Sequence, residues 1–411
     1  MNYEYFIAKR ITGSKSYKSS ISGPIIKIGI VAIAIGLIVM LIAISTGTGL
    51  QKKIREKAIA FNGHVILSNF DNNTSEESQF PISINQEFYP EFKEIEDIKH
   101  IQGVASKSGV IRTENDIEGV ILKGVGKDYD WHYFEEYLIE GKLPEYSERT
   151  SNDIIMSSYT ANRLGLQLND SFEMVFLRAN TGRHAQRRFN IVGIFSSGFQ
   201  DLDKTFLLGD IRHIQRLNSW KDNEIGSFEI FIDNFDDLDV IGTEIYQKTP
   251  STLKTEKVSE RYAVIFEWVK IFDKNIYGII VIMIIVAGIN MITALLVLIL
   301  ERTQMIGILK ALGSNNWSVR KMFLYNASYL VLRGLFWGNI IGLSFLFIQK
   351  QFKLIKFPNP EEYNMTYVPV YLNLDYILLL NIGTFIMCFI MLLVPSYIIT
   401  KISPVKAIRF E

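Results

Sequence analysis

The chain has five histidines, the side chains that most often ligate zinc or act as general bases near neutral pH. A zinc hydrolase would need the H-E-x-x-H spacing, which puts two imidazoles on one face of a helix. No two histidines of this sequence are so spaced, since they are His64, His100, His132, His184 and His213. The histidines therefore predict no metal centre.

Other chemical motifs also fail on their spacing. The segment "KGVGKDYD" (123–130) has glycine and lysine but lacks the G-x-x-x-x-G-K-[ST] spacing that cradles phosphates, so we interpret it as a turn. No G-x-S-x-G nucleophile elbow occurs, and the acidic run "DNFDDLD" (233–239) lacks the calcium-loop pattern. The single cysteine, Cys388, lies in an apolar run and allows no disulfide. We predict that this chain is not an enzyme and binds no cofactor or metal.

Composition divides the chain into two kinds of segment. Hydrophobic residues make up 48% and charged residues 21%, a mixture that predicts membrane spans plus a sizeable water-soluble domain. Residues 51–270 include 26 basic and 36 acidic side chains, whereas the rest of the chain has 17 and 7. An acidic soluble part argues against a nucleic-acid-binding surface.

Four apolar runs are long enough to cross a bilayer, whose hydrocarbon core takes ~20 apolar residues. The predicted spans are residues 25–50, 271–300, 322–348 and 376–399. The first is predicted to be an uncleaved anchor, because its apolar core is longer than that of a signal peptide. Basic residues gather before the first span, between the second and third, and after the fourth. The loop 349–375 also has three lysines, which count against the orientation that the other three groups favour. The positive-inside rule then predicts that both termini are cytoplasmic and that 51–270 lies outside.

The predicted outer segment alternates strand-like and helix-like runs. The strand-like runs are residues 64–70, 119–125, 153–158, 171–177, 189–195 and 227–233, and the helix-like runs are 91–101, 158–166 and 210–220. The predicted fold class is thus an α-helical membrane bundle of four transmembrane helices, with a large α+β extracytoplasmic domain between the first and second spans.

Two shorter segments have helical apolar spacing on the predicted cytoplasmic side. In "ERTQMIGILKALG" (301–313), Met305, Ile308, Leu309 and Leu312 fall at i, i+3, i+4 and i+7, which predicts a short surface helix. Residues 1–24 begin with "MNYEYFIAKRI", which predicts an amphipathic helix on the inner leaflet.

The third span has two unusual features. Arg333 lies mid-span, where a charge costs at least ~2.5–3.5 kcal/mol, so it should face the bundle interior, a lipid headgroup or a water-filled cleft. Gly334, Gly338 and Gly342 recur at four-residue intervals, a spacing that favours close packing against another helix.

This organisation resembles the FtsX-like (type VII) ABC transporter permeases. The resemblance rests on one span, a large outer domain, three further spans, the 301–313 segment and the terminal "ISPVKAIR" (402–409). Outer segments such as "GVILKGVGKDYD" (119–130) and "EGKLP" (140–144) are similar to those of lipoprotein-releasing (Lol-type) permeases. The resemblance implies a MacB-like core domain over 51–270, an FtsX-like permease domain over 271–405 and a short cytoplasmic tail over 400–411.

The resemblance also implies partners. Residues 301–321 would include the coupling helix that docks on a separate ATPase, present in two copies, which binds the ATP and Mg²⁺. The implied contact residues are Arg302, Met305, Ile306, Gly307, Leu309, Lys310, Leu312 and Gly313. Met305 departs from the family pattern, because many relatives have an acidic residue there. A second permease copy, or a paralogue, would complete a dimer in the bacterial inner membrane.

Substrate and carrier follow from the same resemblance. An outer-membrane lipoprotein would enter a cleft lined by the outer ends of the first two spans, with Met40, Ile44, Leu50, Phe272 and Ile276 as the implied lining. A periplasmic lipoprotein carrier would dock on the hairpin "RANTGRHAQRR" (178–188), a candidate basic surface formed by Arg178, Arg183, Arg187 and Arg188. An ordinary solvated hairpin is the alternative.

Two other functions fit the same sequence pattern. One is a MacB-like mechanotransmission pump that exports peptides or drugs, and the other is a non-transporting FtsX-like regulator of cell-wall hydrolases. The sequence leaves open which substrate is carried and whether the dimer is homomeric.

Overall fold

The computed structural model describes residues 3–7, 22–72, 75–114, 116–146, 149–178, 182–358 and 365–404. The chain divides into two compact units. Unit 1 draws on residues 1–51, 268–355 and 368–411, and unit 2 on residues 52–267 and 356–367.

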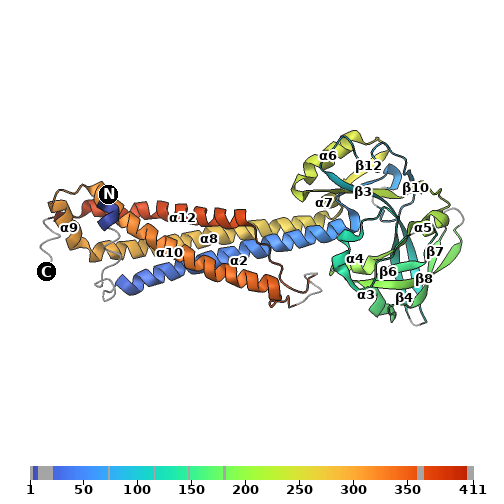
Figure 1. Ribbon diagram of the computed structural model, residues 1–411, viewed down its shortest axis with the longest axis horizontal. Helices are drawn as coiled ribbons and strands as arrows, with labels where there is room; N and C mark the ends of the chain where they lie inside the picture. The colour runs from blue at the N-terminus through green and yellow to red at the C-terminus, as the bar shows by residue number, and fades with distance from the viewer. Residues whose placement is uncertain are drawn as a thin grey trace. The chain divides into compact units, whose positions relative to one another are not determined.

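Unit 1 is built from long helices (Figure 1). Its helices are α2 (Ser22–Asn62), α8 (Ala263–Glu301), α9 (Thr303–Ala311), α10 (Asn316–Phe352), α12 (Leu374–Ser396) and α13 (Ile398–Lys401). The last turns of α2 and the first turns of α8 belong to unit 2. Within the predicted N-terminal helix, residues 3–7 are helical and 8–21 lie outside the described residues, as do 405–411 of the tail.

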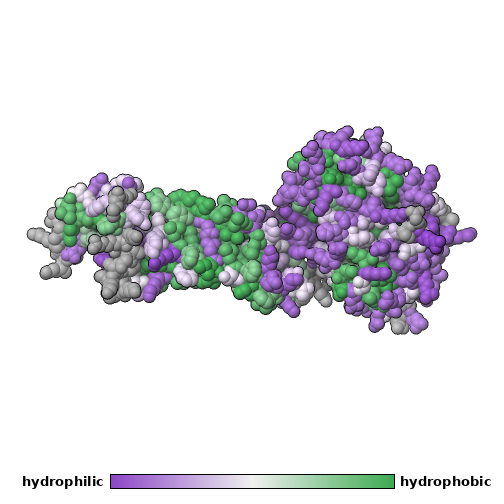
Figure 2. All heavy atoms as spheres, viewed as in Figure 1, coloured by the Kyte–Doolittle hydropathy of each residue, from purple (hydrophilic) through white to green (hydrophobic). Residues whose placement is uncertain are grey.

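Among the residues that the structure describes, four helices are long and apolar enough to cross a membrane, which confirms the predicted fold class. They are Gly23–Asn62, Ala263–Glu301, Asn316–Phe352 and Leu374–Lys401. Hydrophobic side chains cover much of the helical surface of unit 1, whereas the surface of unit 2 is mainly hydrophilic (Figure 2). α2 and α8 extend beyond the predicted spans 25–50 and 271–300.

Glycines let α10 pack closely on α2, as their spacing predicts. A Cβ at Gly334 would lie 2.7 Å from the Cβ of Ile33, and one at Gly338 would lie 3.0 Å from the carbonyl oxygen of Ala34. Such distances leave no room for a larger residue without movement of the partner helix. Arg333, next to Gly334, is exposed on unit 1, and its guanidinium lies 4.5 Å from the ring centroid of Tyr329.

An amide pair joins α10 to α12. The Nδ2 of Asn339 donates to Oδ1 of Asn381 at 2.6 Å, and the Nδ2 of Asn381 donates to Oδ1 of Asn339 at 3.1 Å. Each amide also donates to a carbonyl of its own helix four residues earlier. Reciprocal bonds of this kind fix the register of two helices in an apolar surrounding.

Unit 2 is built around a ten-stranded mixed sheet of order β12-β1-β11-β3-β4-β9-β6-β8-β5, in which β7 pairs with β3 and β8. These strands are β1 (Val65–Asn69), β3 (Ile98–Arg112), β4 (Ile117–Val125), β5 (Leu138–Gly141), β6 (Asp153–Ser157), β7 (Ser171–Leu177), β8 (His184–Phe195), β9 (Phe206–Asp210), β11 (Ser227–Ile232) and β12 (Leu253–Lys257). A second, two-stranded sheet pairs β2 (Ile82–Ser83) with β10 (Glu224–Ile225).

Short helices pack against this sheet and complete its core. They are α3 (Ser158–Leu164), α4 (Gln200–Thr205), α5 (Ile211–Asn218), α6 (Leu238–Lys248) and α7 (Val258–Arg261). α5 packs on β3 and β4, where a Cβ on Gly124 would lie 2.6 Å from the Cα of Ile211. α6 packs on β12, and α3 packs on β6.

The predicted helix over residues 91–101 is wrong, because β3 begins at Ile98 and the preceding residues form turns. Phe92 is buried and stacks on Phe88, with ring centroids 5.4 Å apart. Ile101 is also buried and pairs with Ile230 of β11. The apolar residues with helix-like spacing therefore contact one core from a turn and a strand, not from a single helix.

Candidate functional site

α9 is the short helix that was predicted within residues 301–313, where the expected ATPase contact lies. The helix ends at Ala311, and Gly313, two residues further on, has a φ of +93°, in the left-handed region that favours glycine. The Gly313 and Ser314 amides donate to the carbonyls of Lys310 and Leu309, both at 3.0 Å, and close the end of the helix. α10 then starts with Asn315 as its N-cap, whose Oδ1 accepts from the Ser318 amide at 2.7 Å.

The predicted contact residues divide between two faces of α9. Ile306 is 0% exposed and Gly307 is also buried, so both face the interior of unit 1. Met305 and Leu309 pack against the same apolar core. In contrast, Ile308 is 46% exposed and Leu312 is 79% exposed. The exposed apolar surface at α9 therefore centres on Ile308 and Leu312.

Lys310 makes contacts inside unit 1. Its ammonium donates to the carbonyl oxygens of Ile399 at 2.6 Å and Ile402 at 2.9 Å. These carbonyls lie at the end of α13, where backbone oxygens lack helical partners and favour a cation. Lys310 thus joins α9 to the end of the fourth span, and Arg302 lies partly buried at the N-cap of α9.

The five predicted cleft residues are not equally accessible. Met40 and Leu50 are buried within unit 1, whereas Ile44, Phe272 and Ile276 are partly buried. A Cβ on Gly47 of α2 would overlap the side chain of Ile276 of α8, so these two helices are in direct contact at that point. Side chains from both helices thus lie at one depth of the bundle.

The basic hairpin is formed by β7, β8 and the turn between them. Arg188 is directly opposite Glu173 of β7, while Arg187 is opposite the buried Met174 on the other face. The Arg178 amide donates to the carbonyl of Arg183 at 3.0 Å, and residues 179–181 lie outside the described residues.

One member of this basic surface was not predicted. Burial, followed by the nearby Arg178 and Arg216, lowers the pKa of Arg187. Arg216 lies on α5 and is exposed. No local pattern marks it, because α5 and the hairpin are separate in sequence and meet in the core, where the ring centroids of His213 and Phe189 lie 5.0 Å apart.

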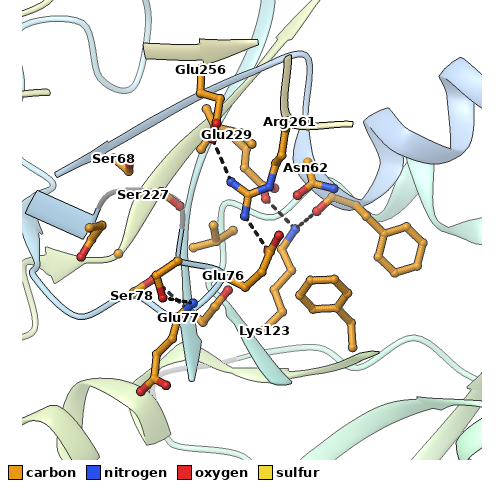
Figure 3. Close-up of a pocket in the computed structure, with 18 residues that line it drawn as sticks. Asn62, Ser68, Glu76, Glu77, Ser78, Lys123, Ser227, Glu229, Glu256 and Arg261 are labelled. Atoms are coloured by element: carbon orange, nitrogen blue, oxygen red, sulfur yellow. Dashed lines mark hydrogen bonds and ion pairs between the residues drawn. The ribbon is translucent and has the colours of Figure 1, made fainter. Parts of the chain in front are cut away.

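A small polar cavity of about 40 Å³ lies in unit 2. Figure 3 shows Lys123, Glu229 and Arg261 on its wall. These charged side chains come from β4, β11 and α7, which are far apart in the sequence, so no local spacing marks them as a group. Within the described ranges, no group of three or more His, Cys, Asp and Glu side chains could hold a metal ion.

Known protein families match both parts of the chain. The MacB-like periplasmic core domain matches residues 28–261, and the FtsX-like permease C-terminal domain matches residues 277–404. The chain belongs to the FtsX-like permeases with a MacB-like periplasmic core domain. It is therefore a multi-pass inner-membrane permease with a large periplasmic domain between its first two spans.

Similar proteins cover almost the full length of this FtsX-like permease. The lipoprotein-releasing system transmembrane protein LolC of Buchnera aphidicola is 23% identical over 94% of each chain. LolC of Xylella fastidiosa is 20% identical over 99% of this chain and 97% of that protein. Among solved structures, the periplasmic region of MacB from Actinobacillus actinomycetemcomitans aligns with 50% of this chain and 95% of its own, at 15% identity and a TM-score of 0.33.

Proposed function

We propose that this permease is a transmembrane subunit of an ATP-driven lipoprotein-releasing transporter. The observation that carries the proposal is the similarity to LolC proteins along 94% or more of the chain, spanning both the membrane helices and the periplasmic domain. The transporter would extract outer-membrane lipoproteins from the inner membrane and pass them to a periplasmic carrier.

Energy would come from a separate ATPase that binds ATP and Mg²⁺. Two ATPase subunits would serve two permeases, either two copies of this chain or this chain with a paralogue. The exposed Ile308 and Leu312 would enter an apolar groove of the ATPase, while Ile306 and Lys310 hold α9 on the bundle. This arrangement supports docking because a partner would meet a short helix fixed at both ends.

Lipoprotein acyl chains would enter between α2 and α8. Ile44 and Phe272 are partly buried, so their accessibility would change if these helices separated. The Gly47–Ile276 contact would have to open for this entry, since the two helices touch there. Closing the helices after ATP binding would return these side chains to apolar contact and expel the acyl chains.

The β7–β8 hairpin would receive the carrier. Arg178, Arg183, Arg187 and Arg188, together with Arg216 of α5, give this end of the acidic domain a local positive charge. These arginines would attract an acidic surface on the carrier, and the range of this attraction would become shorter as the salt concentration rises.

Co-purification distinguishes this proposal from the alternatives. The full-length permease, expressed with its ATPase and extracted in mild detergent, should retain a triacylated lipoprotein identifiable by mass spectrometry. Retention of a periplasmic adaptor and an outer-membrane channel would favour the export pump. A bound cell-wall amidase would favour the hydrolase regulator, and either result would contradict lipoprotein release.

A further inference from the structure

A buried ion pair lies where α2 meets the sheet of unit 2. The Lys123 ammonium on β4 lies 2.6 Å from Oε1 of Glu229 on β11. Lys123 is 2% exposed and Glu229 is 3% exposed. The second carboxylate oxygen of Glu229 accepts from Nε2 of Gln102 on β3 at 2.9 Å, so three neighbouring strands share the network.

The same ammonium also bonds to the last turn of α2. Lys123 Nζ donates to the carbonyl oxygen of Phe61. Figure 3 shows Lys123 close to Asn62 and Glu229. α2 has no basic residue in its own last turn. Carbonyls at a helix C-terminus attract a cation, so Lys123 supplies from the sheet the charge that α2 lacks.

After α2 the chain makes a tight turn against β11, the strand of Glu229. Gly63 has φ of +66°, and a Cβ there would lie 3.1 Å from the Cβ of Glu229. The amide of His64 then donates to the carbonyl of Ile230 at 2.8 Å. The end of α2 is therefore held to β11 by backbone as well as side-chain contacts.

The second connecting helix is joined to the first. Nδ2 of Asn62 donates to the hydroxyl of Tyr262 at 2.9 Å, and the carbonyl of Tyr262 accepts from the amides of the first turn of α8. Arg261 donates to Glu76 at 2.5 Å and to Glu256 at 3.1 Å. Through Asn62 and Tyr262, the end of α2 and the start of α8 form one fastened junction.

Stability alone is a poor reason for such a pair. Removing two charges from water costs several kcal/mol, and apolar residues of similar volume are often as stable or more so. The pair instead fixes the orientation of α2 on the sheet. Hydrogen bonds are directional and set the angle between the helix and the strands, whereas apolar contacts would allow the helix to slide.

We propose that Lys123 and Glu229 are positioning residues that fasten the ends of the first-span and second-span helices to the periplasmic sheet. A displacement of α2 during the ATP cycle then moves the sheet instead of being lost at the junction. This inference rests on the proposed transport function, but the junction it describes can be measured without substrate.

The test uses the double variant Lys123→Met/Glu229→Gln in the full-length permease, assembled with its ATPase in nanodiscs. The substitutions remove both charges, leave no uncompensated ion and keep an amide to accept from Gln102. Amides of residues 59–63 should exchange with deuterium at least about tenfold faster than in the wild type, because the last turn loses its cap. Lipoprotein released per ATP hydrolysed should fall by at least about fivefold, with ATP hydrolysis retained.

The matched control is Lys107→Met/Glu77→Gln. Lys107 is also a buried lysine of the sheet, and its ammonium lies 3.0 Å from Glu77 in the segment before β2. Exchange of residues 59–63 and release per ATP should remain at the wild-type level. An equal effect in this control would overturn the proposal, since any buried ion pair would then serve.

The outcomes separate the inference from the function on which it rests. Wild-type exchange and release in the Lys123→Met/Glu229→Gln variant would overturn the inference. A wild-type complex that releases no lipoprotein would overturn the proposed function, while exchange at 59–63 would still decide the junction. If the double variant does not fold, Tyr262→Phe removes only the hydroxyl that Asn62 bonds, and unchanged exchange at the start of α8 would then count against the proposal.

Discussion

His64 follows α2 directly and is buried beside β11. Its Nδ1 accepts from the amide of Ile232 at 3.2 Å, so the neutral ring is the form that fits. Burial first, and then the charge of Lys99, lower its pKa from 6.5 to about 4. The fold therefore favours an uncharged imidazole at this position.

This shift predicts a loss of stability in mild acid. Between pH 6.5 and 4, His64 binds a proton in the unfolded chain but stays neutral in the folded chain. Its contribution to the free energy of unfolding is therefore fully present above pH 6.5 and is lost as the pH falls to 4. The total loss should reach about 3 kcal/mol. His64→Gln keeps an acceptor for Ile232 but does not titrate. Thermal unfolding of the full-length protein in detergent at pH 7.5 and 4.5 should show a smaller acid loss in the variant; equal losses would contradict this account.

The residues of α9 show which features can be predicted from sequence and which cannot. The pattern over 301–313 correctly indicated a helix with apolar side chains, but several of its faces are apolar. Which face the bundle covers depends on the core of unit 1 and the end of α13, which contact Ile306 and Lys310. These contacts are distant in sequence, so no local spacing could assign Ile306 to the interior and Leu312 to the surface.

Among the elements, α9 carries the most direct prediction. Leu312→Asp places a charge on its most exposed apolar position without touching the core. We expect co-purification of the ATPase to fall at least about tenfold, as for loss of a central interface contact. The control, Lys350→Asp, alters an exposed charge at the other end of α10 and should leave binding unchanged. Undiminished ATPase binding by Leu312→Asp would place the contact elsewhere.

The contact between α10 and α2 gives a second element-scale prediction. Gly334→Ala puts a Cβ 2.7 Å from that of Ile33, and overpacking of this kind costs about 1–3 kcal/mol. Gly383→Ala is the control, because a Cβ there has no neighbour within 4 Å and a helical glycine is replaced by a better helix former. The first variant should melt below the wild type and the second at or above it. Equal melting temperatures would mean that α10 and α2 separate at little cost.

Elements were predictable where the pattern was local. The run 171–177 alternates cleanly and forms β7 with the same bounds, and the glycine spacing of the third span correctly indicated a close helix contact. β3 was missed because it is a central strand that buries polar residues such as Gln102 and Lys107, so its sequence does not alternate. Only its pairing with β4, β7 and β11 makes it a strand.

For the whole molecule, the permease is expected to depend on a partner for energy. Its sequence contains no phosphate-cradling loop, so the purified chain should show no magnesium-dependent ATP hydrolysis above the background of a mock preparation. Activity should appear when the ATPase is added. Robust turnover by the chain alone, insensitive to removal of every co-purifying ATPase, would contradict the assignment of roles.

Under the proposed function, the acyl chains of a lipoprotein bind between α2 and α8. A photo-crosslinking amino acid at Phe272, and separately at Ile44, tests it in the full complex within membranes. A third position, Leu379 of α12, is exposed on unit 1 and serves as the lipid-facing control. We predict that Phe272 and Ile44 capture a lipoprotein before ATP is added and lose it afterwards, while Leu379 captures only phospholipid. Crosslinks from Phe272 and Ile44 to phospholipid or a soluble peptide alone would contradict lipoprotein release and favour the export pump.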